Sequence, residues 1–336
     1  MPHSNPTLVH ITRGGAVESM HRGRALVMRS NGDVLWSVGD VEELTYPRSA
    51  IKAFQALPMV ASGAVEALGI SDEELALCCA SHNGEDRHTA VADAFLQRLN
   101  LAEPAFECGT HWPMGQQATI DLAWRHTKPD ARHNNCSGKH LGMLALAVHK
   151  GWNTQGYVKP EHPVQQAIKA CIEDCCTTSL DGVPLSPDGC TAPTWAMPLH
   201  RLALGFARFA DQSQLPAQYQ AAARALHRAA TQHPFLVAGT ERYCTEVMAA
   251  LGDEAFLKVG AEGVYIAALP RLKLGVAIKM DSGSAPAAEV AMSAILRQLG
   301  FDLPEKWQSV ALRNRNGLLT GAIAPVESAY ADLKLA

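Results

Sequence analysis

Two residues with the spacing of a nucleophile and its base occur early in the chain. Ser49 is followed by Lys52 three positions later, and residues i and i+3 lie on the same face of a helix. A serine hydroxyl attacks a carbonyl poorly unless a base removes its proton, and a desolvated, neutral lysine can be that base. The alternative is a serine that caps a helix beside a solvated lysine, because Ser-x-x-Lys arises readily by chance.

Two further fragments favour an acyl-transfer site. Serine acyl-transfer enzymes of the penicillin-recognising type carry Ser-x-x-Lys, then Ser-Asp-Asn, then Lys-Thr-Gly on a strand. The same order is found here in Ser49-x-x-Lys52, Ser81-His82-Asn83 and Lys258-Val259-Gly260. The second and third fragments match in outline only, but the shared order predicts a serine acyl-transferase site.

A polar turn follows the apolar run from Leu75 to Ala80. A polar turn with a glycine directly after a buried segment is a good place for functional side chains, which makes His82, Asn83 and Glu85 candidates for binding a substrate. Glu85 also suits the first turn of a helix, and both interpretations can hold together. In the later turn Cys108 to Pro113, His111 is either close to the site or structural.

The densest cluster of potential metal ligands is the segment His133 to His140, which contains Cys136 and Lys139, and Cys190 is a further candidate. Zinc requires thiolate or imidazole groups held near tetrahedral geometry, and a helix start favours the thiolate form of Cys136. Lysine is an unusual ligand because its ammonium must first lose a proton. Spacing alone does not choose between a zinc site and buried cysteines that act as small hydrophobes.

Composition excludes several classes of partner. The 336 residues are 47% hydrophobic and 18% charged, and the net charge of −4 gives no reason to expect nucleic acid or an anionic membrane. No run of 18 apolar residues occurs, and the segment Met1 to Pro6 lacks the basic-then-apolar form of a signal peptide. Nine cysteines without a small-scaffold spacing suit reduced thiols. We therefore expect a soluble cytoplasmic protein.

Strand patterns lie at both ends of the chain and helical patterns lie between them. The predicted strands are Thr7–Thr12, Ala25–Met28, Val34–Val38, Phe256–Val259, Val264–Ala268 and Lys273–Lys279, with hairpin turns at Asn31-Gly32 and around Pro270. The predicted helices are Ser49–Ser62, Thr89–Asn100, Gly138–Lys150, His162–Cys176, Leu199–Ala210, Ala217–Gln232, Glu241–Leu251 and a last one at about Ala287–Leu299. Pro58 is expected to bend or end the first helix.

These patterns predict an α+β fold with an antiparallel sheet built from both chain ends and an inserted helical block. We expect a single domain over residues 1–336, with the sheet part at about 1–46 and 255–336 and the helical part at about 47–254. Serine β-lactamases and glutaminases share this plan, although a shared fold does not by itself fix a function.

Taken together, six motifs resemble those of the rhizobial-type L-asparaginases, also called class 3 of the asparaginase II family. The motifs are Tyr46-Pro47-Arg48-Ser49-x-x-Lys52, Ser81-His82-Asn83-Gly84-Glu85, Cys108-Gly109-x-His111-x-Pro113, His133-Asn134-x-Cys136-Ser137-Gly138-Lys139-His140, Asp188-Gly189-Cys190 and Lys258-x-Gly260-Ala261-Glu262-Gly263. The resemblance runs from about Leu8 to Leu299.

The resemblance implies a lactamase/glutaminase-like fold, a homodimer, and hydrolysis of L-asparagine to L-aspartate and ammonia. It implies two catalytic Ser–Lys pairs, Ser49 with Lys52 and Ser81 with Lys258, and a Zn²⁺ ion held by Cys136, Lys139 and Cys190. Within this picture Arg48 is a candidate partner for the carboxylate of the amino-acid substrate.

Three alternatives stay open at this point. Asparagine and glutamine differ by one methylene, which a pocket discriminates by only about 1–3 kcal/mol, so a glutaminase or another serine amidohydrolase is a close rival. A zinc-dependent hydrolase in which Ser49 only caps a helix is a second. A non-catalytic, thiol-rich binding or redox-sensing protein is a third, against which stands the absence of a Cys-x-x-Cys pair.

Overall fold

The computed structural model describes residues 5–335. The prediction that the segment Met1 to Pro6 is not a signal peptide concerns residues that lie mostly outside this range. The chain divides into two compact units. The sheet unit comprises the residues up to Ala50, Met197–Gln214 and the residues from Leu257 on, and the helical unit comprises Ile51–Ala196 and Leu215–Phe256. The single-domain organisation expected from the sequence stays a prediction.

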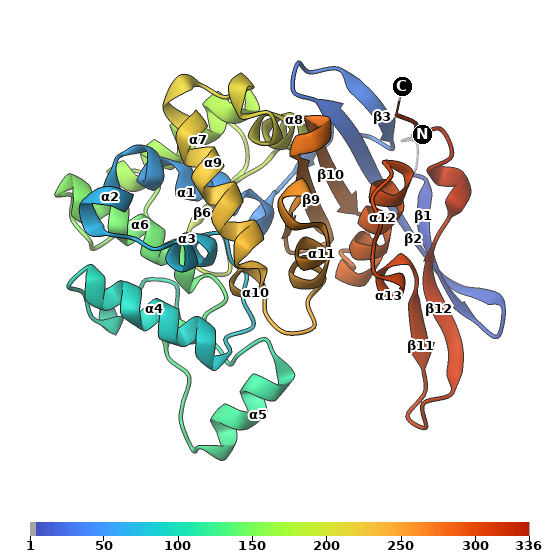
Figure 1. Cartoon of the computed structure of the whole chain (residues 1–336), viewed down its shortest axis with the longest axis horizontal. Coiled ribbons are helices and arrows are strands. Elements are labelled where there is room, and N and C mark those ends of the chain that lie inside the picture. The colour runs from blue at the N-terminus through green and yellow to red at the C-terminus, as the bar shows by residue number, and fades with distance from the viewer. Residues whose placement is uncertain (1–4, 336) are drawn as a thin grey trace. The chain divides into compact units, whose positions relative to one another are not determined.

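The sheet unit is built on one large sheet whose strands come from both ends of the chain (Figure 1). The strand order is β11-β12-β1-β2-β10-β9-β8, and β3 pairs with β2. The pairs of β1 with β2 and β12, and of β10 with β2 and β9, are antiparallel. The strands are β1 Thr7–Arg13, β2 Ala16–Arg29, β3 Val34–Val38, β8 Phe256–Val259, β9 Val264–Leu269, β10 Leu274–Met280, β11 Val310–Arg313 and β12 Leu319–Pro325. The predicted α+β fold with an antiparallel sheet built from both chain ends is confirmed.

Two helices pack against the middle of this sheet, α8 (Leu199–Ala210) and α12 (Ala285–Gln298). The strand β9 is buried along its whole length, as its uninterrupted apolar sequence predicts. The strand β10 meets α8 so closely that a Cβ added at Gly275 would lie 2.2 Å from the carbonyl oxygen of Ala203. Only glycine permits this approach. Near the sheet, the short strands β4 (Leu44–Thr45) and β7 (Met197–Pro198) pair with one another, and α13 spans Glu305–Gln308.

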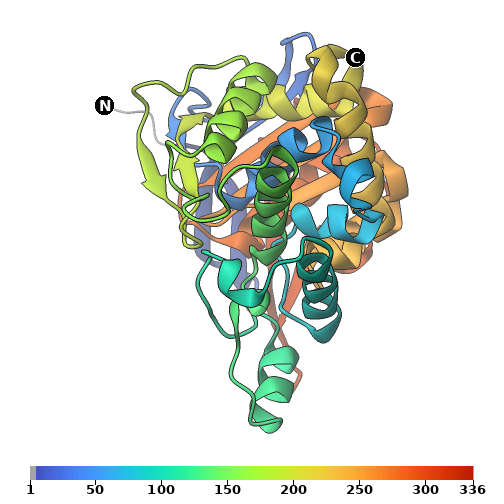
Figure 2. The ribbon, with the colours of Figure 1, turned by 90° about the vertical axis from the view of Figure 1, so that its left-hand side faces the viewer.

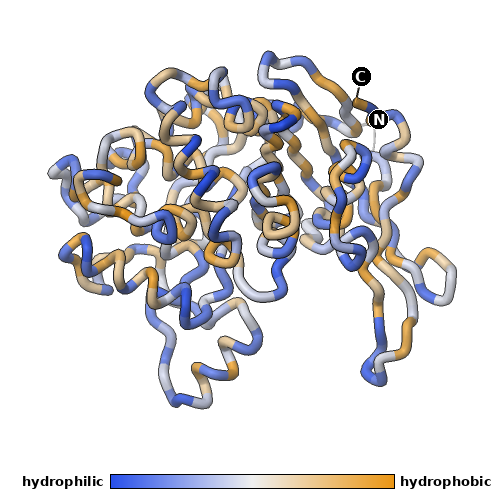
Figure 3. Tube along the Cα trace, in the orientation of Figure 1, coloured by the Kyte–Doolittle hydropathy of each residue, from blue (hydrophilic) through white to orange (hydrophobic). Residues whose placement is uncertain are grey.

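The sequence analysis missed two parts of the sheet, residues 16–24 of β2 and the hairpin of β11 and β12. The hairpin is the larger of the two. Its strands are half-exposed, and the second ends in Ala-Pro, so neither has the apolar character of β9. A signal was nevertheless present, because Asn316-Gly317 at the tip is a strong hairpin turn pair. Figure 3 shows the hydrophilic character of this tip.

The helical unit is organised around α1 (Lys52–Ala61), which packs on α6, α7 and α9 and is buried from Lys52 to Met59. Pro58 was expected to bend or end this helix. It lies inside α1, which continues to Ala61, so Pro58 does not end the helix. The remaining elements are α2 Ala64–Leu68, α3 Asp72–Cys78, α4 Asp86–Arg98, α5 Gln116–Trp124, α6 Ser137–Lys150, α7 Pro163–Cys176, β5 Leu185–Pro187, β6 Pro193–Trp195, α9 Ala217–Gln232, α10 Pro234–Val237 and α11 Tyr243–Leu251.

Four helices of this unit, α2, α3, α5 and α10, were not predicted. The start of α3 has a complete capping box, in which Ser71 and Glu74 satisfy each other's backbone N–H groups, and this Ser-x-x-Glu signal was readable in the sequence. The helix α5 stands apart from the other helices of its unit and exposes Trp124 (Figures 1 and 2). Within residues 5–335, every helix falls short of the length and apolar character needed to cross a membrane.

Candidate functional site

The segment with Ser49 is a short 3-10 turn, Arg48–Ile51, that leads directly into α1 at Lys52. Arg48 has φ of 50°, a backbone conformation that non-glycine residues rarely adopt and that occurs at functional sites in folded proteins. The boundary between the two units falls between Ala50 and Ile51, so Ser49 belongs to the sheet unit and Lys52 to the helical unit.

The amine of Lys52 is completely buried and faces three oxygen atoms of the helical unit. These are the carbonyl of Ala80, the hydroxyl of Ser81 at 3.0 Å and the carbonyl of Asn135 at 3.4 Å. As an ammonium, Lys52 donates to all three. As a neutral amine it donates to the two carbonyls, which can only accept, and its lone pair accepts the proton of Ser81. The surroundings therefore satisfy both protonation states, as a proton-transfer group requires.

Ser81 is held in place by backbone hydrogen bonds on both sides. The N–H of Ser81 donates to Val237, that of His82 to Asn135 and that of Asn83 to Ala238. The position of the Ser81 hydroxyl beside Lys52 is therefore set by main-chain hydrogen bonds. A pairing of Lys52 with Ser81 was not among our sequence-based predictions.

The three predicted substrate-binding residues after Ser81 all make contacts within the helical unit. The His82 ring is buried, contacts the Ser137 hydroxyl at 2.9 Å through Nε2 and accepts the N–H of Gly84 at 3.0 Å through Nδ1. Since Nδ1 accepts, the proton lies on Nε2, and burial holds the pKa of His82 well below its ordinary value. His82 is thus a neutral ring that fixes the loop.

Asn83 and Glu85 line a cavity of about 780 Å³ in the helical unit. Asn83 accepts a hydrogen bond from Arg242 at 2.8 Å, and Glu85 accepts from the backbone and the hydroxyl of Thr240 at 2.8 and 2.6 Å. Burial alone would raise the pKa of Glu85, but the hydrogen bonds from Thr240 and Asn83 hold it below its ordinary value. Glu85 is therefore ionised and ties the loop at Thr240 to the loop after Ser81.

The predicted metal ligands Cys136, Lys139 and Cys190 converge in the helical unit. The Lys139 amine donates to the Cys190 sulfur at 2.8 Å. A hydrogen bond from the Cys136 thiol, aided by the Lys139 charge, outweighs burial and lowers the pKa of Cys190 to about 4. The same hydrogen bond, together with burial, raises the pKa of Cys136 to about 12. Burial alone would lower the pKa of Lys139, but the two sulfurs hold it above its ordinary value. The cluster is thus a thiolate, a thiol and an ammonium.

In the sheet unit, the end of β8 touches the turn that carries Ser49. A Cβ added at Gly260 would lie 2.7 Å from the carbonyl oxygen of Pro47 and 3.3 Å from the Cβ of Ala50. Lys258, two residues earlier, is buried and donates to the carbonyl of Val259 at 2.7 Å. The sheet unit therefore brings the Lys258 and Ser49 segments side by side.

A cavity of about 710 Å³ opens in the sheet unit beside these two segments. Its lining has three cations and three carboxylates, Arg24, Arg48, Lys279, Glu43, Glu262 and Asp281. Arg24 is buried and bonded to Glu43 and Thr45, whereas the Lys279 amine donates only to the carbonyls of Glu262 and Met280 among its described partners. Burial and then the nearby Arg24 charge lower the pKa of Lys279. Arg24 and Lys279 were not recognised in the sequence, because nothing in their local pattern marks them.

The predicted pairs Ser49–Lys52 and Ser81–Lys258 each have one member in each unit, and they stay predictions. No group of three or more histidine, cysteine, aspartate or glutamate side chains that could hold a metal ion occurs among residues 5–335. The groups that the structure does assemble in the helical unit are a lysine amine on a serine hydroxyl and a separate cluster of two cysteines and a lysine.

The chain belongs to the L-asparaginase II family, whose model matches residues 9–325. At this level it is an asparaginase-type amidohydrolase acting on a small-molecule substrate. None of the curated proteins matches the chain significantly in sequence.

The chain is also similar to solved structures. One is a β-lactamase from Mycobacterium bovis, with 15% identity over 78% of this chain and 88% of that chain and a TM-score of 0.42. Another is a provisionally named β-lactamase from Bacteroides dorei, with 12% identity over 82% of this chain and 93% of that chain and a TM-score of 0.45.

Proposed function

We propose that this protein is an L-asparaginase of the rhizobial type, which hydrolyses L-asparagine to L-aspartate and ammonia through a serine acyl-enzyme. The observation that carries the proposal is the buried Lys52 amine 3.0 Å from the Ser81 hydroxyl, in a chain of the L-asparaginase II family. A lysine shielded from water and bonded to a hydroxyl is the base that a serine enzyme needs.

In the proposed mechanism Ser49 is the nucleophile. Its Oγ attacks the side-chain amide carbon of asparagine, and its proton passes to Lys52. Backbone N–H groups at the start of the turn, including that of Ser49, stabilise the oxyanion. The C–N bond then breaks, the proton reaches the leaving ammonia through the Lys52–Ser81 contact, and water hydrolyses the aspartyl ester. Lys258 is proposed as the second partner of Ser81.

The cavity beside Arg48 is suited to the head group of the amino acid. An α-amino acid presents a carboxylate and an ammonium, and the lining supplies cations and carboxylates in equal number. We assign the substrate carboxylate to Arg48 and Lys279, because an anion next to the partly buried Lys279 offsets the repulsion from Arg24. Asn83 and Glu85, engaged with Arg242 and Thr240, keep the Ser81 loop in place.

We propose that Cys136, Lys139 and Cys190 hold a zinc ion. The two sulfurs and the amine are joined only through donated protons, so an ion that displaced these protons would find three ligands of types that zinc accepts. Bound zinc would supply a positive charge that attracts an oxygen or nitrogen of the substrate. Because Ser49 already supplies a nucleophile, we assign the cluster to substrate positioning and pocket integrity.

Two further proposals concern the whole protein. All nine cysteines are buried, and none of them forms a disulfide within residues 5–335, which supports a cytoplasmic location. The homodimer follows from the family resemblance alone, and sedimentation of the purified protein tests it.

The decisive experiment measures ammonia release from L-asparagine and from L-glutamine by the wild type, Ser49→Ala, Ser81→Ala and Lys52→Met. We expect release from asparagine that falls at least about a thousandfold in Ser49→Ala, as for other activated nucleophiles. Glutamine preference would favour the glutaminase alternative. An active Ser49→Ala enzyme that fails only when its metal is stripped would favour a zinc-dependent hydrolase.

A further inference from the structure

The backbone of Asn135 links the two chemical groups of the helical unit. Its carbonyl oxygen accepts from the Lys52 amine at 3.4 Å and from the backbone N–H of His82 at 3.2 Å. The next residue is Cys136, whose thiol donates to Cys190. Asn135 therefore supplies an acceptor of Lys52 and directly precedes a member of the thiol cluster in the chain.

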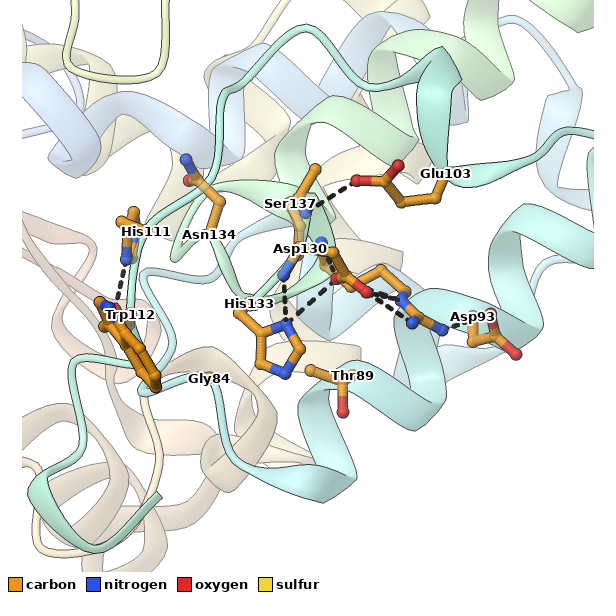
Figure 4. A network of polar contacts seen from close by, with 12 residues as sticks. Gly84, Thr89, Asp93, Glu103, His111, Trp112, Asp130, His133, Asn134 and Ser137 are labelled. Carbon is orange, nitrogen blue, oxygen red and sulfur yellow. Dashed lines mark hydrogen bonds and ion pairs between the residues drawn. The ribbon is translucent and has the colours of Figure 1, made fainter. Parts of the chain in front are cut away.

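The N–H of Asn135 is bonded to the ring of His111. The distance from this nitrogen to Nε2 of His111 is 3.0 Å. The other ring nitrogen, Nδ1, contacts the carbonyl oxygen of Trp112 (Figure 4), and the two atoms are 2.6 Å apart. A carbonyl can only accept, so Nδ1 carries the proton and Nε2 has the free lone pair. The Trp112 carbonyl thus sets the tautomer that accepts from Asn135.

The neighbours of Asn135 are fixed by a different side chain. The Asn134 amide donates to the carbonyls of Cys108 and Gly109 at 2.8 and 3.1 Å and accepts the N–H of Cys136 at 2.9 Å. Asn134 therefore holds the residues on each side and leaves the Asn135 N–H to His111. A backbone donor left without its acceptor in a part-buried site destabilises that conformation, so loss of His111 favours another arrangement of Asn135.

We propose that His111 is a positioning residue of this active site. Its Nε2 holds the backbone N–H of Asn135 and thereby favours the conformation in which the Asn135 carbonyl faces Lys52. The expected change in kcat rests on the proposed function. The effect on the Asn135 backbone is measured by hydrogen exchange and does not depend on any activity. His111 is assigned this role because it contacts the Trp112 carbonyl and the Asn135 N–H.

The test compares His111→Ala with His111→Gln. Glutamine can place its Oε1 near the position of Nε2 and accept from Asn135, whereas alanine cannot. The matched control is Trp112→Ala, which removes an exposed side chain from the same loop and keeps the carbonyl that binds Nδ1. Two quantities are measured, namely hydrogen exchange of the Asn135 amide and the kcat and KM for asparagine.

We expect the Asn135 amide to exchange at least about tenfold faster in His111→Ala, and near the wild-type rate in His111→Gln and Trp112→Ala. We expect kcat to fall by about 10- to 100-fold in His111→Ala, with a smaller change in KM, and to recover in His111→Gln. Unchanged exchange in His111→Ala overturns the proposal, and so does a His111→Gln enzyme as impaired as His111→Ala. If the wild type proves inactive on asparagine, the exchange rates still decide whether His111 positions Asn135.

Discussion

Three buried histidines of the helical unit, His82, His88 and His140, predict a loss of stability in mild acid. Burial is the main reason that each has a lowered pKa, and for His82 and His140 the pKa is well below its ordinary value. His88 is stacked between His82 and Phe235, with ring centroids 4.8 Å away on each side. The folded protein therefore keeps these rings neutral at a pH where the unfolded chain takes up protons.

The size of the effect follows from proton linkage. Between about pH 7.5 and pH 5.5, an unfolded histidine with a pKa of about 6.5 goes from about one-tenth to about nine-tenths protonated. A histidine that stays neutral in the folded state then lowers the free energy of unfolding by RT ln 10, about 1.4 kcal/mol. Three such groups give up to about 4 kcal/mol. The unfolded state binds more protons, so stability decreases as the pH falls.

Urea unfolding of the wild type and of His88→Gln at both pH values isolates one of the three. The Cys190 thiolate, with a pKa of about 4, adds a further loss on acidification, but this loss is common to both proteins and cancels in their difference. We expect the acid-induced loss to be smaller in His88→Gln by up to about 1.4 kcal/mol. Equal pH dependence of the two proteins would refute the assignment of His88 as a neutral ring.

Three other predictions concern single residues. Gly260→Ala places a methyl 2.7 Å from the Pro47 oxygen and should destabilise the protein by about 1–3 kcal/mol in urea unfolding, whereas Gly189→Ala, which meets no atom within 4 Å, should change stability little. Equal effects would argue against the contact between β8 and the Ser49 turn. Ser71→Ala breaks the capping box of α3 and should cost about 1 kcal/mol in the same assay, and an unchanged urea midpoint would contradict it. In metal-free protein the thiolate ultraviolet absorbance should persist down to about pH 4 and be missing in Cys190→Ser, and its loss near neutral pH in the wild type would contradict the low pKa.

The sequence predicted those strands, helices and turns that are determined by their own residues. The apolar strand β9, the helix α8 and the hairpin turn at Asn31-Gly32 were all predicted from their own residues. The strands β11 and β12 were missed because pairing with β1 and with each other stabilises them, which their half-exposed sequences do not indicate. The capping box before α3 was present but was hidden by the apolar run that follows it.

The candidate site shows the same limit. The spacing of Ser49 and Lys52 suggested one partner for the lysine, whereas the partners observed in the helical unit are Ser81 and two carbonyl oxygens. Main-chain acceptors such as that of Asn135 carry no signal in the sequence, because every residue has a carbonyl. The convergence of Cys136, Lys139 and Cys190 was expected only through the family resemblance, since the two cysteines are separated by a long and unrelated stretch of chain.

The pairing of β1 with β12 has a consequence for synthesis of the protein. Val9 pairs with Pro325, so β1 must wait for a strand that is synthesised much later. All segments of the helical unit precede Leu257, and its Lys52–Ser81 contact can form on the nascent chain. The β1–β2 hairpin meanwhile has unpaired edges that invite association with other chains. We therefore expect newly made chains to depend on chaperones until the final hairpin emerges, and to gain activity only after release.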